Sequence, residues 1–403
     1  MPRTLIAITE AQRRVLDATS PLATEAVAID DALGRVLAQD VQAAGDVPPF
    51  PCSAMDGYAV VAGNAGRTLH IVGESRAGTP SHHRLADSEA IRISTGAAIP
   101  PGATAVIPQE NVDVNGGDSI HTNAASPPGE HIRGAGEDMR AHTIVLTAGT
   151  RLGPVALGAA TAAGVGSVIT ARRPRVSVLC TGDELRAPGE PLGPGEIHNS
   201  NAPMLTGLAR RAGAVAGRAS LLPDDRDATT QGIATALTDS DVVIITGGVS
   251  VGPHDHVKPA LDHLGVEEVF WSVALQPGKP TWFGVPAEGD PLVFGLPGNP
   301  VSAVVTYSLF VAPALAVLQG APTPEPPRPT AVLSEEVARN PRRDQMIRVR
   351  LTDHDGVLRA DLNRAQGSHI LTSLLGADAL ALIPMGEGTL ASSATVALHA
   401  LAS

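Results

Sequence analysis

The chain of 403 residues is long enough for about two to four domains, each with its own hydrophobic core. Its net charge of −12 argues against a general surface for nucleic acid or anionic lipid. Two tryptophans, two tyrosines and five phenylalanines are too few for base-stacking platforms. The two cysteines, Cys52 and Cys180, predict reduced buried thiols rather than a disulfide framework.

Two uncharged stretches bear on membrane insertion. Residues 152–171 are mostly Gly, Ala and Thr and are too weakly apolar to favour lipid. Residues 301–318 are long enough to span a bilayer, but they contain Ser302, Thr306 and Pro313 and follow a turn directly. This pattern predicts a helix buried against a parallel sheet. The N-terminus has no charged region followed by an apolar core, so we expect no export signal and a cytoplasmic location.

The first part of the chain predicts helices around an inserted β domain. Residues 9–18 predict a helix with Thr9 as its cap and Gln12 at capping-box spacing. Residues 30–38 predict a second helix, weakened by Gly34. Residues 46–134 change to short strands and many turns, which predicts a mostly β domain. We expect it to be inserted into one discontinuous, elongated domain made of residues 1–45 and 135–173.

Residues 174–320 alternate strands and helices, which predicts a doubly wound α/β domain with a parallel sheet. The predicted strands are residues 175–180, 214–222, 242–246, 266–270 and 292–296. The predicted helices are residues 202–212 and 225–237, one from 255 and one from about 299. Four polar or glycine-rich loops follow strands: residues 181–184, 223–225, 246–248 and 297–300. Because parallel strands end at one edge of a sheet, these loops predict a site there.

A proline-rich segment separates this region from the end of the chain. Residues 321–330 hold five prolines in ten positions, which indicates a stiff linker at a domain boundary. The short alternating segments of residues 331–403 predict a small C-terminal β domain.

The stretch from Asp241 to Asp255, DVVIITGGVSVGPHD, is the strongest local signal. A β-branched strand runs into Gly247-Gly248, a turn whose backbone N–H groups can bind an anion ahead of a helix. The alternative is an ordinary tight turn between strand and helix. Lys279, in the turn QPGKP, is a candidate phosphate partner or a solvated lysine.

The predicted edge is rich in carboxylates: Glu184, Asp224, Asp225 and Asp255. Acids beside a phosphate site repel the phosphate unless a divalent cation lies between them, and Mg²⁺ prefers such oxygen ligands. Helix capping is the alternative for Asp225 and Asp255, since each opens a predicted helix. In the β domain, Asp56 and Thr95 lie in turns, and Asp138 lies in a similar turn just after this domain; nothing local joins these turns to the α/β edge.

Seven motifs occur in the order seen in one enzyme family: PCSAMDGYAV, STGA, GEDM, TGDEL, TGGVSVGPHD, PGKP and LPGNPVS. From about residue 5 to residue 400, the chain resembles the molybdopterin molybdenumtransferases, bacterial enzymes similar to the C-terminal part of gephyrin. The resemblance implies an elongated discontinuous domain, an inserted β domain, an α/β molybdopterin-binding domain and a C-terminal β domain. It also implies a homodimer that shares its active cleft between subunits.

The implied reaction inserts molybdenum from molybdate into adenylylated molybdopterin (adenylyl-molybdopterin) and releases AMP, with Mg²⁺ as cofactor. The implied active-site residues are Asp56, Thr95, Asp138, Glu184, Asp224 (or Asp225) and Asp255, with Glu184, Asp224 and Asp255 as metal ligands. The implied pterin-phosphate pocket consists of Thr246, Gly247, Gly248, Ser250, Lys279, Pro297, Pro300 and Ser302. Oxyanion donors are expected among Thr95, Ser302 and basic residues such as Arg348.

One departure and three alternatives accompany the resemblance. Many members have lysine where this chain has Gln276, which leaves one cation fewer near the anions. The alternatives are a tungstate-inserting paralogue, a molybdopterin adenylyltransferase and a non-catalytic pterin-binding scaffold. The adenylyltransferases lack the domain with MDGYA and STGA, and a scaffold does not need the acids. Expected partners are small-molecule substrates, a second copy of the chain, and transiently the adenylyltransferase and molybdoenzymes, with no nucleic acid and no membrane.

Overall fold

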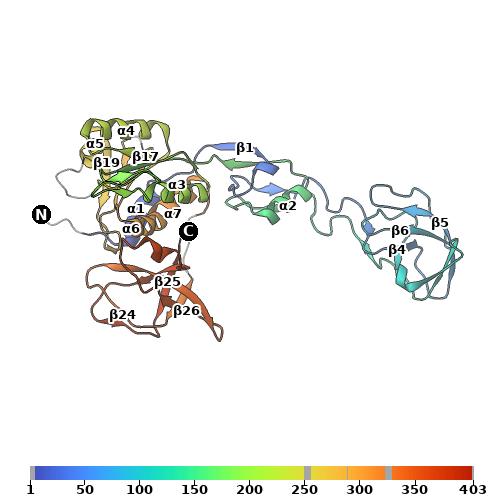
Figure 1. Cartoon of the computed structure of the whole chain (residues 1–403). Helices are drawn as coiled ribbons and strands as arrows, with labels where there is room; N and C mark the ends of the chain where they lie inside the picture. The colour runs from blue at the N-terminus through green and yellow to red at the C-terminus, as the bar shows by residue number, and fades with distance from the viewer. Residues whose placement is uncertain (1–4, 249–255, 288, 323–328, 402–403) are drawn as a thin grey trace. The chain divides into compact units, whose positions relative to one another are not determined.

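The computed structural model describes residues 5–248, 256–287, 289–322 and 329–401. By internal contacts the chain divides into two compact units, each treated by itself below. The α/β unit comprises Met1–Glu25, Gly34–Ala38 and Thr170–Ser403, and the β unit comprises Ala26–Leu33 and Gln39–Ile169. Figure 1 labels their helices and strands.

The α/β unit is organised around a seven-stranded sheet with the order β16-β13-β18-β22-β21-β19, in which β17 also pairs with β13. The strands that run parallel are β13 (Arg175–Thr181), β16 (Val215–Ala216), β17 (Ser220–Leu222), β18 (Val242–Thr246) and β22 (Leu292–Leu296). The antiparallel strands are β19 (Val266–Trp271) and β21 (Trp282–Pro286). The predicted parallel sheet is confirmed, but β21 was missed and the strand predicted at residues 214–222 is split into β16 and β17.

Helices cover both faces of this sheet, because successive residues of its buried strands point to opposite sides. Val243 and Ile245 pack against α4 (Arg226–Asp239) and α5 (Val257–His263). Val242 and Ile244 pack in a second core with α1 (Ile8–Asp17), α3 (Asn201–Arg211), α6 (Pro300–Thr306) and α7 (Ala312–Leu318). The two groups of helices lie above and below the sheet in Figure 1. This is the doubly wound arrangement that the sequence predicted.

The long apolar segment near residue 300 is a buried helix, as predicted. α6, a π-helical turn (Tyr307–Val311) and α7 form one continuous helix, Pro300–Leu318. Among the described residues it is the one helix long and apolar enough to cross a membrane, yet 72% of it is buried inside the protein. It packs beneath the parallel sheet.

The N-terminal predictions are partly wrong. The helix α1 forms, but Ala7 is its N-cap and no side chain caps it, so Thr9 lies inside the helix and the predicted capping box is absent. Its buried face, Ile8 and Val15, joins the core of the α/β unit. The helix predicted at residues 30–38 is only a 3₁₀ turn, Ile29–Asp31. Gly34 has φ +76°, a left-handed conformation that ends a right-handed helix.

The β unit contains a six-stranded sheet with the order β7-β4-β6-β5-β9-β8. Its strands are β4 (Gly57–Val60), β5 (Thr68–Ser75), β6 (Glu89–Ile93), β7 (Ala105–Pro108), β8 (Val112–Asn115) and β9 (Ser119–Thr122). The smaller elements are β1 (Thr24–Ala28), β2 (Val41–Gln42), β3 (Cys52–Ser53), a 3₁₀ turn (Gln109–Asn111), β10 (Ile132–Arg133), β11 (Ile144–Leu146), α2 (Pro154–Ala162) and β12 (Ser167–Ala171). Two small cores fill this sheet's two faces, one around Tyr58 and one around Ile91.

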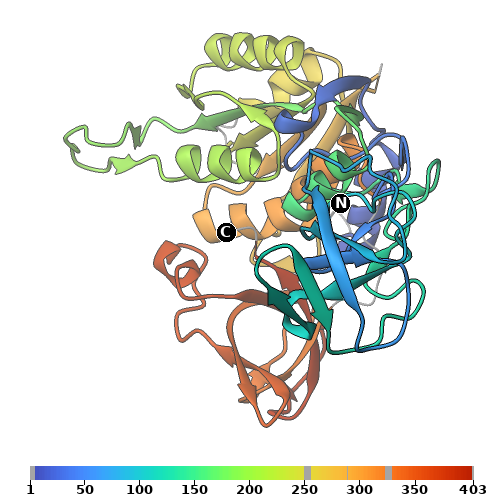
Figure 2. The ribbon, with the colours of Figure 1, turned by 90° about the vertical axis from the view of Figure 1, so that its right-hand side faces the viewer.

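The end of the chain forms a barrel-like sheet, which agrees with the predicted C-terminal β domain. Its order is β20-β25-β26-β23-β29-β27, and a further pairing of β25 with β27 closes it. The strands are β20 (Leu275–Gln276), β23 (Thr330–Leu333), β25 (Asp344–His354), β26 (Val357–Leu362), β27 (Ala379–Ile383) and β29 (Thr395–Ala400). Two short strands, β24 (Val337–Ala338) and β28 (Thr389–Leu390), and a 3₁₀ turn (Leu371–Leu374) accompany them. Figure 2 shows this barrel in red.

Candidate active-site pocket

Three loops meet where the central strands of the α/β sheet end. Cys180, Thr246 and Leu296 are aligned across β13, β18 and β22, so the segments that follow start at one edge. The amide of Gly247 donates to Leu296 O at 3.4 Å, and a Cβ on Gly298 would lie 3.8 Å from the Gly247 Cα. The prediction that these loops share one edge is therefore confirmed.

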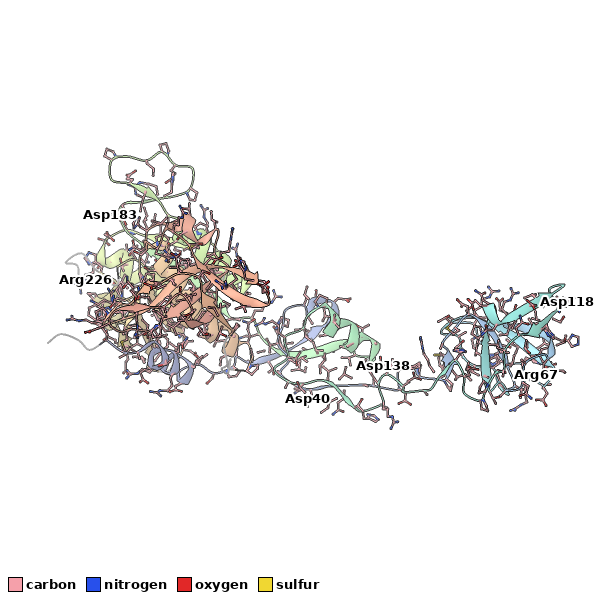
Figure 3. The ribbon with its side chains drawn as sticks, turned by 90° about the horizontal axis from the view of Figure 1, so that it is seen from below. Asp40, Arg67, Asp118, Asp138, Asp183 and Arg226 are labelled. Carbon is pink, nitrogen blue, oxygen red and sulfur yellow. The ribbon has the colours of Figure 1, made fainter. Side chains whose placement is uncertain are left out.

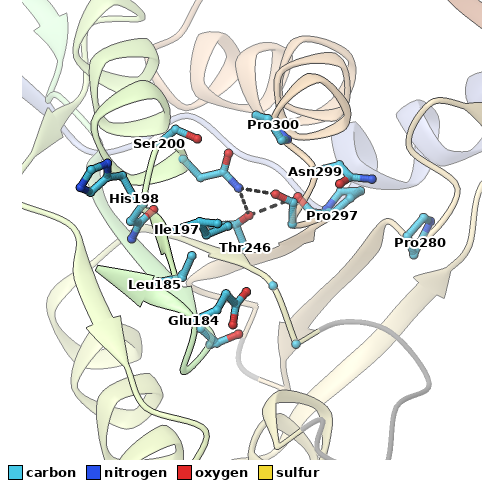
Figure 4. A pocket seen from close by; sticks show the side chains of 16 residues that line it. Glu184, Leu185, Ile197, His198, Ser200, Thr246, Pro280, Pro297, Asn299 and Pro300 are labelled. Carbon is cyan, nitrogen blue, oxygen red and sulfur yellow. Dashed lines mark hydrogen bonds between the residues drawn. The ribbon is translucent and has the colours of Figure 1, made fainter. Parts of the chain in front are cut away.

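A pocket of about 430 Å³ opens at this edge (Figure 4). Its lining comes from the loop after β13, the start of α3, the end of β18, the PGKP turn and the PGNP loop after β22. The residues are Thr181, Glu184, Leu185, Ile197–Asn201, Thr246–Gly248, Pro280 and Pro297–Pro300. Beside it, β14 (Leu185–Arg186) and β15 (Ile197–His198) form a two-stranded arm that projects from the α/β unit in Figure 2.

Gly247, which lines the pocket, and Gly182, in the loop after β13, hold positions that a larger residue would disturb. Gly247 has φ +88°, and a Cβ there would lie 2.5 Å from Thr181 O. Gly182 has φ +143°, and a Cβ there would lie 2.5 Å from Glu184 Oε2. Gly248 is also left-handed, with φ +60°. A glycine turn of this kind can leave backbone N–H groups free to bind an anion.

The PGNP loop, residues 297–300, is tied to its neighbours by hydrogen bonds. The Asn201 Nδ2 donates to Gly298 O at 2.8 Å and to Thr246 Oγ1 at 2.9 Å, and Thr246 Oγ1 donates to Pro297 O at 3.2 Å. Figure 4 draws these bonds as dashed lines. On its other side, Asn299 Nδ2 donates to Ser368 Oγ at 3.0 Å. The loop is thus held by α3, β18 and the C-terminal domain together.

The acids of the α/β edge have different surroundings. Glu184 is exposed and lines the pocket. Asp224 pairs with Asp183: the Asp224 amide donates to Asp183 Oδ1 at 3.0 Å, and the Asp183 amide donates to Asp224 Oδ2 at 3.4 Å. Asp225 caps α4, where its Oδ1 accepts from the Ala228 amide at 2.8 Å. The capping interpretation of Asp225 is therefore confirmed, and Asp224 is the acid free of that role.

The metal prediction remains a prediction. Within residues 5–248, 256–287, 289–322 and 329–401, no three or more His, Cys, Asp or Glu side chains lie close enough together to hold a metal ion. Asp255, the third predicted ligand, and Ser250 lie outside the described residues. Asp183, which Figure 3 labels, is an additional acid that the sequence analysis did not select.

The turn PGKP begins directly after Gln276, the last residue of the barrel strand β20. Pro280 lines the pocket, while the Lys279 side chain next to it is exposed. Gln276 does not replace the missing cation. Its Oε1 accepts from Asn340 Nδ2 at 2.6 Å, which links β20 to the C-terminal domain.

Ser302 and Arg348 are both buried. Ser302 is 4% exposed within α6. Arg348 is fully buried in β25, and burial lowers the pKa of its guanidinium. Its Nη2 donates to Ala365 O at 2.9 Å. Its Nε and Nη1 have no hydrogen-bond partner among the described residues, and Arg348 does not line the pocket.

In the β unit, the structure brings two predicted site loops together. The Thr95 amide donates to Asp56 Oδ1 at 2.8 Å, and both side chains are exposed. Asp138, labelled in Figure 3, is also exposed in this unit, with its amide bonded to Val47 O at 3.0 Å. The pocket described above is lined by the α/β unit alone, so a role for these three residues in it stays a prediction.

Asn199 and Asn201 were not among the residues predicted from the sequence. The sequence predicted α3 to begin at Ala202, whereas Asn201 is its first residue and Asn199 Oδ1 accepts from the Ala202 amide at 3.0 Å. The polar residues 198–201 could have indicated this helix start, because polar residues between a strand and a helix often cap the helix. They also lie where a strand ends, at the edge of the sheet.

Comparisons with known proteins agree with this architecture. Three family models match in order: the MoeA N-terminal region (domain I and II) at residues 6–164, a probable molybdopterin binding domain at residues 177–317, and the MoeA C-terminal region (domain IV) at residues 330–401. A molybdopterin biosynthesis MoeA protein from Pyrococcus horikoshii has a similar crystal structure, with a TM-score of 0.81, 31% identity, and coverage of 98% of this chain and 100% of that one.

Curated relatives carry one name. The molybdopterin molybdenumtransferase of Haemophilus influenzae is 33% identical, covering 98% of each chain. That of Bacillus subtilis is 34% identical, covering 98% of this chain and 94% of its own. Molybdopterin molybdenumtransferase 2 of Mycobacterium tuberculosis is 39% identical, covering 86% and 88%. With three consecutive domain matches and relatives that share nearly its full length, the chain belongs to the molybdopterin molybdenumtransferases, the enzyme family of molybdenum cofactor biosynthesis that its motifs resemble.

Proposed function

We propose that the protein inserts molybdenum from molybdate into adenylyl-molybdopterin and releases AMP, as the last step of molybdenum cofactor formation. The observation that carries this proposal is the pocket at the ends of β13, β18 and β22, where the left-handed pair Gly247-Gly248 lies beside Glu184. A glycine turn that can bind an anion, next to a carboxylate that can hold a cation, suits a reaction at a pyrophosphate.

We assign substrate binding to the glycine loop and to Lys279. The N–H group of Gly248 would donate to a phosphate oxygen, since the Gly247 amide already donates to Leu296 O. The exposed ammonium of Lys279, one residue from the pocket-lining Pro280, would add a positive charge at the rim. Pro297 and Pro300, in the loop next to the glycine turn, also line the pocket. Such contacts orient the phosphoryl group relative to the acids.

The acids at the edge have the chemistry that Mg²⁺ needs. This ion prefers oxygen ligands, keeps several waters and uses only one or two protein carboxylates, so Glu184 and Asp224 are sufficient ligands on their own. Asp183 fixes Asp224 through the two reciprocal backbone bonds. When bound, the ion supplies positive charge that offsets the repulsion between these acids and the phosphates and polarises a phosphoryl oxygen. Asp255 stays the predicted third ligand.

Molybdate is a dianion and needs hydrogen-bond donors. Arg348 supports the expectation that basic residues supply them, because two of its guanidinium nitrogens are buried without a partner among the described residues. A buried cation without an anion is unfavourable, and a bound oxyanion would relieve this cost. Ser302 and Thr95 remain further candidate donors.

We further propose a homodimer with a shared cleft, which would bring Asp56, Thr95 and Asp138 to the pocket. The proposal also includes a cytoplasmic location and transient contacts with the adenylyltransferase and with molybdoenzymes. The pairing of Asp56 with Thr95 supports a shared role for their two loops. Light scattering on the purified protein tests the assembly: the mass of a dimer is expected, and the mass of a monomer at all concentrations would contradict it.

The reaction itself is tested by AMP release. Purified protein with adenylyl-molybdopterin and Mg²⁺ is expected to release AMP when micromolar molybdate is added, with tungstate in a parallel reaction. A matched reaction without oxyanion gives the background. If molybdate gave no AMP above that background, the proposed reaction would be wrong; release with tungstate alone would favour the tungstate-inserting alternative.

A further inference from the structure

Asn201 connects three segments of the pocket from a buried position. Its side chain is only 9% exposed, and it opens α3. Its amide nitrogen donates to Thr246 Oγ1, at the end of β18, and to Gly298 O, in the PGNP loop. Two walls of the pocket are therefore joined through one amide.

The orientation of this amide is fixed by its partners. Gly298 O can only accept a hydrogen bond, so the nitrogen of Asn201 must face it. Thr246 Oγ1 donates its own proton to Pro297 O and so accepts from Asn201. Asn201 Oδ1 must then point away, and it is buried without a partner among the described residues. The two bonds that the amide nitrogen makes therefore outweigh a bond that its oxygen could make in the flipped orientation.

We infer that Asn201 is a positioning residue of this pocket, one that sets the distance between the TGG turn and the PGNP loop. It holds Gly298 against Gly247, while Asn299 is held from the other side by Ser368. Without the amide, Gly298 O and Thr246 Oγ1 lose their shared partner and the loop can move away from β18. The kinetic part of this inference rests on the proposed function, whereas the structural part does not.

The kinetic test replaces Asn201 by leucine, which has a similar size but no donor and adds no charge near the phosphates. Asn201→Leu is expected to raise the KM for adenylyl-molybdopterin by about tenfold or more with a smaller change in kcat, because two hydrogen bonds that shape the binding site are lost.

Gln319→Leu is the matched control. Gln319 is 3% exposed, and its amide also donates two hydrogen bonds, to Ala212 O at 2.8 Å and Leu315 O at 2.7 Å. It lies outside the pocket, at the other end of α3. It should lower the melting temperature about as much as Asn201→Leu while leaving KM unchanged.

Hydrogen exchange of the free protein is the readout that does not depend on activity. In Asn201→Leu, the amides of residues 292–302 are expected to exchange faster than in wild type, and in Gln319→Leu they are not. If Asn201→Leu does not fold, Thr246→Val removes the bond from Asn201 and the bond to Pro297 O, and it should give the same exchange pattern. Equal KM and equal exchange in wild type and Asn201→Leu would refute the inference, as would equal effects of Gln319→Leu. Lack of AMP release by wild type would refute the proposed reaction instead and leave the exchange result valid.

Discussion

Replacing Gly247 by alanine tests whether the backbone shape of the glycine turn is required. Two costs add at this position. A non-glycine residue at φ +88° costs about 1–2 kcal/mol. A Cβ that would lie 2.5 Å from Thr181 O forces the end of β18 away from β13, an overpacking cost of about 1–3 kcal/mol. We therefore expect Gly247→Ala to lower the free energy of unfolding by about 2–5 kcal/mol.

Gly265→Ala separates these two costs. Gly265 has a similar φ of +76°, but no atom lies within 4 Å of the Cβ that alanine would add, and it lies outside the pocket. It should cost only the conformational part, about 1 kcal/mol. Urea unfolding measures both variants, and AMP release at a temperature where each is folded measures function. Gly247→Ala should lose at least about tenfold in kcat/KM and Gly265→Ala none. If the two variants had equal stability and equal activity, the close contact at Thr181 would be irrelevant and the reasoning would fail.

Three further outcomes follow from the hydrogen bonds. Asp225→Ala should lower the free energy of unfolding by about 1 kcal/mol, because α4 loses its cap, and turnover should be retained. Asp224→Ala should abolish AMP release. Urea unfolding midpoints measure the first effect and steady-state rates the second. Burial alone would raise the pKa of the Asp241 carboxyl group, but hydrogen bonds from Arg172 and Arg175 lower that pKa overall. The charged Asp241 carboxylate therefore stabilises the fold at any pH above the ordinary carboxyl pKa. This contribution is lost as the pH falls through the lowered pKa of the folded protein. Asp241→Asn should flatten the acid limb of a plot of unfolding free energy against pH, and an unchanged limb would contradict this. Tyr307→Phe should change the free energy of unfolding by less than about 1 kcal/mol, because the Tyr307 hydroxyl is buried without a partner among the described residues. A larger loss in thermal unfolding would mean that this hydroxyl makes a hydrogen bond.

Much of the α/β unit was predictable because its signals are local. The run Val242–Thr246 is β-branched and bounded by turn residues, and it forms the fully buried centre of the sheet. The apolar segment Pro300–Leu318 was correctly assigned to the core because it directly follows a turn in a βα alternation, where a helix packs against the parallel sheet. Here local pattern and tertiary packing favour the same structure.

The errors occur where local signals conflict or where partners are distant in sequence. Asp30 and Asp31 are good caps, but the left-handed Gly34 ends the turn that they begin. The strand β21 was not predicted because Pro280 precedes it, Gly284 lies inside it and Pro286 ends it. Proline and glycine so close together are typical of a loop. The sequence could not decide between Asp224 and Asp225. The structure gives Asp225 a capping role in α4, a bond that is visible only once the helix start is known.

In the candidate site, too, residues with a local sequence signal were predicted and residues with distant partners were not. Glycines, acids and the lysine were identifiable from residue types, and Gly247, Glu184 and Pro297 indeed line one pocket. Asn201 was not identified, because its importance lies in bonds to residues 45 and 97 positions away. The sequence around Asn201 does not indicate that Thr246 and Gly298 are its hydrogen-bond partners.

A crystal structure of the protein with adenylyl-molybdopterin bound, prepared without molybdate, tests the central claim most directly. The account predicts the pyrophosphate at the TGG turn, with a phosphate oxygen about 3 Å from the backbone nitrogen of Gly248 and the adjacent rim formed by Glu184. A pyrophosphate bound elsewhere, with the TGG turn facing only solvent, would contradict it.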